Sequence, residues 1–252
     1  MDKALQGISA LLERAQSDDR VFPATLLFSE GWMLRLVLQW FADTRTNGHE
    51  LTFAPGAKWF SEARLASPFL RDKPREGYTC ADGVIGHFRV SKVGKAKLSL
   101  ERDAQQFVVI EAKMFSGLSK GTKYAPAYNQ AARNVACMAE IVRRTERDPP
   151  LIPNLAFLVI APELQRENGT FGDCLDTASL KRVIQERALS CDPPKLAWFD
   201  QCKSTIDSIR ICCLSWESVI AHIKAADATF GDDLEIFYEQ CLQFNRLPAV
   251  LD

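Results

Sequence analysis

Two carboxylates and a lysine in the middle of the chain have the types and spacing of a hydrolytic site. Glu111 and Lys113 end the apolar run at 107–110 (FVVI), which is typical of a buried strand. Because side chains alternate along a strand, Glu111 and Lys113 project from the same face of it. Asp82 immediately precedes another apolar segment upstream. The alternative for the charged pair is an ordinary strand exit toward solvent.

These residue types suit hydrolysis of a phosphodiester bond. Negative charge develops on the attacking, leaving and nonbridging oxygens, and hard divalent cations with oxygen ligands stabilise it. Asp82 and Glu111 would supply two carboxylate ligands to Mg²⁺ or Mn²⁺, and the carbonyl of Ala112 a third oxygen. Lys113 would orient or help to deprotonate the attacking water, or stabilise the developing charge.

The order of aspartate, hairpin and Glu-x-Lys strand resembles the PD-(D/E)XK nuclease superfamily over about residues 24–160. Asp82, Glu111 and Lys113 match the motif, and Ala81 stands where a proline is usual. The resemblance implies an α/β, restriction-endonuclease-like fold with a central mixed sheet flanked by helices on both faces. It also implies a metal-dependent nuclease acting on nucleic acid, with DNA favoured over RNA.

Two polar residues follow the motif in a helix expected over 126–146. Gln130 and Arg133 resemble the polar residues that many members of the superfamily carry there. Gln130 is therefore predicted to assist catalysis, and Arg133 to bind nucleic acid. The alternative for both residues is a solvated helix face.

Glu30 is the third candidate metal ligand. It lies in an apolar segment, 24–42, that is expected to be helical, and its neighbours three and four residues away are all apolar. Such a carboxylate needs a partner from elsewhere or a metal, and the resemblance implies a place in the metal site. In the alternative, the helix starts here with Ser29 as its cap, and Glu30 is a solvated first-turn acid.

The segment around the motif is locally basic. Eight lysines and arginines between 83 and 123 face three acidic residues. Lys120 and Lys123, in the loop after the motif, are predicted to contact phosphates, whereas hairpin lysines can equally protect an edge strand. Glu62, in a segment at 58–70 expected to be partly helical, is most simply explained by an exposed helical face.

Composition bounds the remaining possibilities. The net charge of −1 argues against a generally basic nucleic-acid coat, though not against a local basic channel. Eight cysteines without a CxxC pair, and only three histidines, argue against a zinc site and favour a reducing cytoplasm. Residues 1–20 show no signal pattern and no apolar stretch reaches membrane-spanning length, so we expect a cytoplasmic protein without a membrane partner.

The pattern predicts one nuclease-like α/β domain over 1–252, with a core at about 24–160 and a C-terminal extension at 161–252. The extension carries no chemical motif and is expected to continue the sheet and cover its face. Further helices are expected at 2–16, 180–189, 216–225 (capped by Ser215) and 232–244, strands at 154–161, 209–214 and 51–53, and a hairpin from 83–90 and 96–101.

Two other functions are open. A nucleic-acid-binding or assembly protein would keep a nuclease-like fold without turnover, although the complete triad argues against it. An unrelated α/β enzyme acting on a small molecule is disfavoured because the chain lacks a Walker-type loop, a GxSxG elbow and clustered histidines. Besides nucleic acid, a homodimer or an activating protein partner is left open.

Overall fold

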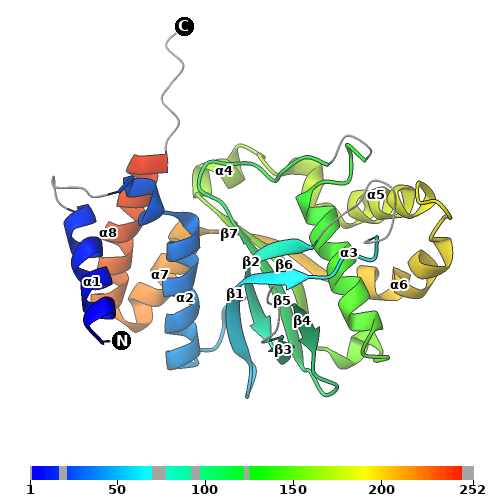
Figure 1. Cartoon of the computed structure of the whole chain (residues 1–252), viewed down its shortest axis with the longest axis horizontal. Helices are drawn as coiled ribbons and strands as arrows, with labels where there is room; N and C mark the ends of the chain where they lie inside the picture. The colour runs from blue at the N-terminus through cyan, green and yellow to red at the C-terminus, as the bar shows by residue number, and fades with distance from the viewer. Residues whose placement is uncertain (1, 17–21, 70–77, 92–96, 122–124, 246–252) are drawn as a thin grey trace, which may run out of the picture.

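The computed structural model describes residues 2–16, 22–69, 78–91, 97–121 and 125–245 and shows an α/β protein with a five-stranded mixed sheet (Figure 1). The strands are β1 (Lys58–Leu65), β2 (Thr79–Gly86), β3 (Phe88–Val90), β4 (Leu98–Leu100), β5 (Gln106–Ala112), β6 (Asn154–Ala161) and β7 (Arg210–Ser215). The sheet order is β1-β2-β5-β6-β7, and β3 and β4 form a separate hairpin. β1, β2 and β5 pair antiparallel, whereas β5, β6 and β7 pair parallel.

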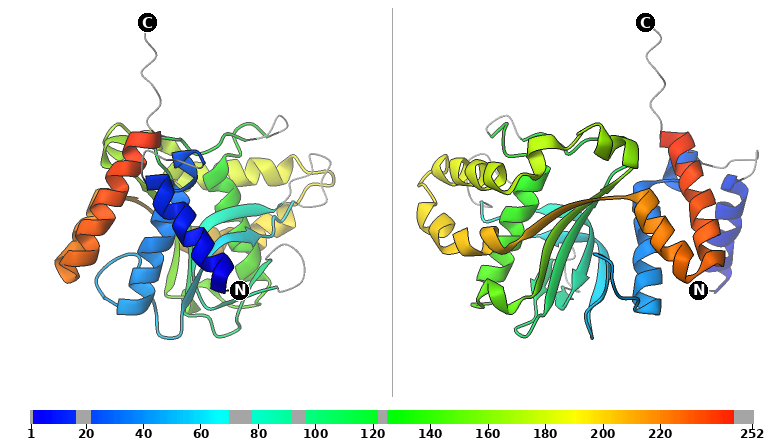
Figure 2. Two further views of the ribbon diagram at one scale, coloured as in Figure 1. Left: turned by 60° about the vertical axis from the view of Figure 1, so that its left-hand side comes forward. Right: turned by 180° about the vertical axis from the view of Figure 1, so that it is seen from behind.

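The helices are α1 (Asp2–Gln16), α2 (Glu30–Thr44), α3 (Gln130–Arg143), α4 (Glu163–Glu167), α5 (Thr177–Leu189), α6 (Leu196–Ser208), α7 (Trp216–Ala226) and α8 (Ala228–Asn245). The layer of α1, α2, α7 and α8 covers one face of the sheet, and α3, α5 and α6 cover the other (Figures 1 and 2). The chain crosses from α6 to α7 through β7 (Figure 2). Among the described helices, none has the length and apolar character needed to cross a membrane.

Burial on both faces explains the apolar run of β5. Phe107 and Val109 belong to the core beneath α3, whereas Val108 and Ile110 belong to the core beneath α2. Every residue of the strand is buried. A strand buried on two faces is continuously apolar rather than alternating, and this one remains so until Glu111.

Several predicted elements are confirmed. The motif strand, the strand at 154–161 and the first helix lie where the sequence places them, and β7 continues the sheet as expected. The expected hairpin of 83–90 with 96–101 forms only between 88–90 and 98–100, because 83–86 belong to β2 of the main sheet. Ser215 caps α7, because its side chain accepts a hydrogen bond from the Ser218 amide. The expected helix at 24–42 begins at Glu30, as its alternative proposes, but the Ser29 side chain makes no capping hydrogen bond.

Three predicted elements are wrong. The segment at 58–65 is the edge strand β1 and not a helix, and 51–53 forms no strand. α3 starts at Gln130 instead of near Pro126, because the Asn129 side chain accepts from the Ala132 amide and so caps the helix there. The sequence patterns also miss α4 and α6.

Candidate active site

Strand register places Asp82 beside Glu111. β2 and β5 pair antiparallel with Gly83 opposite Ile110. Asp82 precedes Gly83 and Glu111 follows Ile110, so the two acids lie opposite each other. Asp82 Oδ2 accepts a hydrogen bond of 2.8 Å from the Ala112 amide. Glu111 is fully buried, whereas a quarter of the Asp82 side chain is exposed. The pair therefore has one buried and one accessible carboxylate.

Lys113 lies against both acids. Its Nζ is 3.1 Å from Glu111 Oε2 and 3.9 Å from Asp82 Oδ2. The backbone is fixed on both sides, since the Lys113 amide donates to the Ile160 carbonyl and its own carbonyl accepts from Trp216 Nε1. The structure thus brings Asp82, Glu111 and Lys113 together at the end of β5.

The first turns of α3 hold the Glu111 carboxyl from the opposite side. Gln130 Nε2 donates to Glu111 Oε2 at 2.6 Å, and Asn134 Nδ2 donates to Oε1 at 2.7 Å. Gln130 also accepts from the Ser119 amide, which ties the loop after the motif to the site. Asn134 is absent from the sequence prediction. Its position four residues after Gln130, on the same helix face, is the signal that could have revealed it.

The environment of Glu111 favours its protonated form. Burial raises the pKa of Glu111 to about 8, and the charge of Asp82 adds to the effect of burial. The Lys113 ammonium and the hydrogen bond from Asn134 act in the opposite direction. A cation between Asp82 and Glu111 would favour the ionised form, because a positive charge lowers the pKa of a neighbouring carboxyl.

Glu62 is a third carboxylate at the same level of the sheet. The pairs of Ser61 with Gly83 and of Ala63 with Ala81 on either side place Glu62 opposite Asp82. Burial, and next the charge of Asp82, raise the pKa of Glu62 above its usual value. Glu62 is exposed, as expected, but it lies on the edge strand β1 and not on a helix.

The backbone of Glu62 is left-handed, with φ of 56°. Trp59 packs in the core beneath α2, whereas Ala63 packs in the core beneath α3, although an even spacing would place them on one face. β1 therefore changes its facing at Glu62. A non-glycine residue in this conformation carries backbone strain, a feature that clusters at functional sites.

Arg35, not Glu30, is the residue of α2 that contacts Glu62. Its Nη2 is 3.5 Å from Glu62 Oε1, and its Nε donates to Ser61 Oγ at 3.1 Å. Glu30 lies near Cys241 of α8, where its charge adds to burial in raising the thiol pKa to about 12. The described contacts of Glu30 are thus with α8, and no described contact joins it to Lys113, Gln130 or Asn134, the side chains that hold Glu111.

The loop after the motif is pinned by Arg133. Its guanidinium donates to Ser119 Oγ at 2.6 Å and to the Lys120 carbonyl at 3.2 Å. Lys120 is exposed close to the start of α3. Lys123 lies outside the described residues. Lys120 thus lies in the loop that Gln130 ties to Glu111, and Arg133 contacts that loop from α3, whereas Lys123 is left unplaced.

The donor chemistry of the site fits Mg²⁺ or Mn²⁺. Within the described ranges, no three or more histidine, cysteine, aspartate or glutamate side chains are grouped to hold a metal ion. Mg²⁺ commonly uses one or two carboxylates and keeps several waters, so the Asp82–Glu111 pair is a sufficient set. The Asn134 Oδ1 atom, on the amide that binds Glu111, is buried without a hydrogen-bond partner in the described part of the chain. The surroundings are thus rich in hard oxygen atoms.

Comparisons of the chain with models of protein families, with curated proteins and with solved structures find no match.

Proposed function

We propose that this protein is a metal-dependent nuclease that hydrolyses phosphodiester bonds of nucleic acid, DNA in preference to RNA. The observation that carries the proposal is the placement of one ammonium against two carboxylates. Lys113 Nζ lies 3.1 Å from Glu111 and 3.9 Å from Asp82, on side chains from two adjacent strands. The choice of DNA rests on the resemblance of the Asp82 and Glu-x-Lys motif to the PD-(D/E)XK superfamily.

The arrangement of the sheet supports a restriction-endonuclease-like fold. An antiparallel unit, β1-β2-β5, carries the acids, and β6 extends it in parallel after the crossover through α3. The resemblance implies this order of hairpin, motif strand, helix and strand. The polar start of α3 then faces the motif, as the contact from Gln130 to Glu111 requires.

Asp82 and Glu111 would hold Mg²⁺ or Mn²⁺, which when bound stabilises negative charge on the scissile phosphate. Gln130 and Asn134 position Glu111 by donating to its two oxygens. Lys113 holds a water or a developing charge beside the phosphate, because its ammonium is fixed and almost buried. Glu62, which lies opposite Asp82, adds negative charge beside this pair.

The test is cleavage of a mixed substrate panel by the full chain in Mn²⁺. The panel holds linear duplex, supercoiled plasmid, single-stranded DNA and RNA. Lys113→Met keeps most of the stem and removes the ammonium, so its cleavage rate is expected to fall by about 10² or more. Lys203→Met, which removes an exposed lysine of α6, is the matched control and is expected to cleave like the wild type.

Undiminished cleavage by Lys113→Met would overturn the assignment of the site. Absence of cleavage by the wild type on every substrate, with retained binding of nucleic acid, would favour a binding or assembly protein. Calorimetric titration with Mn²⁺ separates the two roles of the site. Lys113→Met is expected to keep metal binding, whereas Glu111→Gln is expected to lose it.

A further inference from the structure

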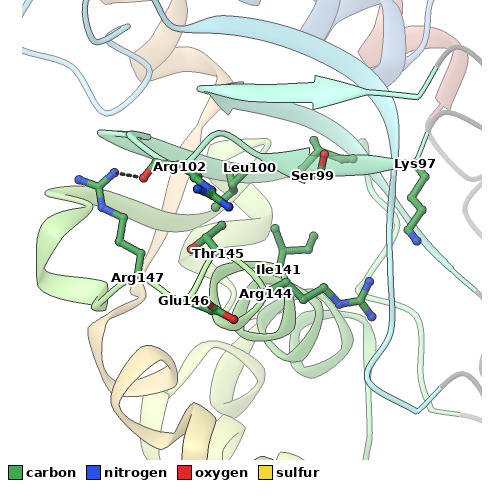
Figure 3. Close-up of a pocket in the computed structure, with 10 residues that line it drawn as sticks. Lys97, Ser99, Leu100, Arg102, Ile141, Arg144, Thr145, Glu146 and Arg147 are labelled. Atoms are coloured by element: carbon green, nitrogen blue, oxygen red, sulfur yellow. Dashed lines mark hydrogen bonds between the residues drawn. The ribbon is translucent and has the colours of Figure 1, made fainter.

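A second candidate site lies at the far end of α3. A cavity of about 660 Å³ opens between β4 and the last turn of this helix (Figure 3). Gln130 begins α3 at the candidate active site, and Arg144 follows the end of the helix at the cavity. A helix of 14 residues is about 20 Å long, so the cavity is separate from the carboxylate pair.

The rim of the cavity is cationic. Lys97 and Arg102 line it from the strand side and Arg144 from the helix side, and Glu146 is the one carboxylate among the described residues of its lining. In Figure 3 the side chains of Lys97 and Arg144 extend toward the same side of the opening. Cations are favourable at the end of a helix, which accounts for Arg144. It does not account for Lys97 and Arg102, which come from another part of the chain.

The neighbouring arginines hold the walls of the cavity in place. Arg147 donates to the carbonyls of Arg102, Ala104 and Leu151, so its guanidinium joins the strand side to the helix side. Arg144 is oriented by the buried Glu140, to which its Nε donates at 2.7 Å. This hydrogen bond leaves the Nη groups of a half-exposed guanidinium for a ligand.

The floor is apolar. Leu98 and Ile141 are buried beneath the opening, and Leu100 is half-buried beside them. Cations around an apolar floor suit a ligand with an anionic group and a flat, weakly polar body. The volume lies within the range of about 300–1,000 Å³ that is typical of small-molecule sites.

We propose that this cavity binds a nucleoside phosphate, with the phosphate on Lys97 and Arg144 and the base against the half-buried Leu100. Arg102 adds positive charge across the opening. The ligand is either a free mononucleotide or one nucleotide of a nucleic-acid strand. The inference does not depend on hydrolysis at the other end of α3.

The test is calorimetric titration of the full chain with AMP and, separately, with a 5′-phosphorylated single-stranded oligonucleotide, both in EDTA. Lys97→Met/Arg102→Met removes two rim cations whose side chains make no hydrogen bond within the described residues. We expect saturable binding by the wild type that weakens about tenfold or more in this variant, because it removes one cation that binds the phosphate and a second positive charge on the rim.

Arg89→Met is the matched control, because it removes an exposed arginine of the same hairpin outside the cavity. It is expected to bind as the wild type does. AMP binding that depends on Lys97 and Arg102 identifies a free mononucleotide. Dependence seen for the oligonucleotide alone identifies a nucleotide of a strand. The proposal is overturned if neither ligand binds saturably, or if Arg89→Met weakens binding equally.

Discussion

The buried carboxyl of Glu111 is surrounded by donors and yet favours its proton. Gln130, Asn134 and Lys113 all donate to it, which should favour the charged form. Complete burial and the adjacent Asp82 outweigh them and raise its pKa to about 8. Asp82 stays partly exposed. The two acids therefore differ in solvation. Two ionised carboxylates side by side would repel each other, and either a proton on Glu111 or a cation between the two acids relieves this repulsion.

The difference between the pKa of Glu111 in the folded protein and its usual value predicts how the free energy of unfolding depends on pH. Between about pH 4.5 and 8 the native Glu111 carboxyl keeps its proton while the unfolded one has lost it, so stability falls as pH rises toward 8. One such group contributes at most about 1.4 kcal/mol per pH unit. Glu111→Gln is expected to remove this slope. The measurement is urea unfolding in EDTA between pH 6.5 and 8, wild type beside variant.

The range from pH 6.5 to 8 is chosen because His49 has an opposite effect on stability at lower pH. Burial lowers the pKa of His49 to about 4, so this residue makes stability rise with pH between about 4 and 6.5. Hydrogen bonds lost in Glu111→Gln shift stability equally at every pH, so the slope alone is the readout. Glu62→Gln, at a half-exposed acid, is expected to change the slope less. Equal slopes in wild type and Glu111→Gln would contradict the argument.

Single residues were predictable from the sequence only where strand alternation determines their position. Glu111 and Lys113 share a face because they are two residues apart on one strand. Arg35 could not be distinguished from Glu30, because their roles depend on how α2 is rotated against β1. Rotation is set by packing, and the Leu34 and Leu38 contacts with Gly83 became visible only in three dimensions.

At the scale of elements, the position of Asp82 depends on the close approach of α2 to β2. A Cβ at Gly83 would lie 2.9 Å from Leu34 Cδ2 and 3.0 Å from Leu38 Cδ1. Gly83→Val is therefore expected to displace α2 and cost about 1–3 kcal/mol in unfolding free energy. Because Asp82 precedes this position, we also expect weaker Mn²⁺ binding. Chemical denaturation and calorimetric metal titration measure the two effects.

The matched control is Gly117→Ala, because a Cβ there meets nothing within 4 Å. The double variant Gly83→Val/Leu34→Ala makes room for the added methyl groups and is expected to lose less stability than the two single variants together. Contacting residues of this kind couple by about 0.5–3 kcal/mol. Additive losses in the double variant would show that Gly83 and Leu34 do not compete for space.

Elements were predictable in proportion to how uniformly they are buried. β5 and β6 are continuous apolar runs, and the sequence places them within a residue. β1 is an edge strand with only two fully buried positions, and the left-handed Glu62 interrupts its alternation. Its apolar residues therefore do not alternate as in a regular strand, and the sequence was interpreted as partly helical. The motif strand and its acids were thus predictable, whereas the third acid was hidden by a misassigned element.

At the scale of the whole molecule, the proposed nucleic-acid binding would depend on a few local cations. The net charge is −1, so there is little general attraction toward a polyanion. Five of the described cations lie toward the two ends of α3: Lys120 and Arg133 in and against the loop after the motif, and Lys97, Arg102 and Arg144 at the cavity. A substrate strand at the active site would meet Lys120 first, because Arg133 is occupied with the loop.

Lys120→Ala is therefore expected to weaken binding of duplex DNA without regard to sequence. The slope of log affinity against log salt should fall by about 0.9, the value for one lost phosphate contact. Fluorescence anisotropy in EDTA, which prevents turnover, measures this slope from low to moderate salt. Lys203→Ala removes the same charge from α6 and should leave the slope unchanged, since the effect depends on position rather than on net charge. An unchanged slope in Lys120→Ala, or an equal change in both variants, would show that Lys120 is an ordinary solvated lysine.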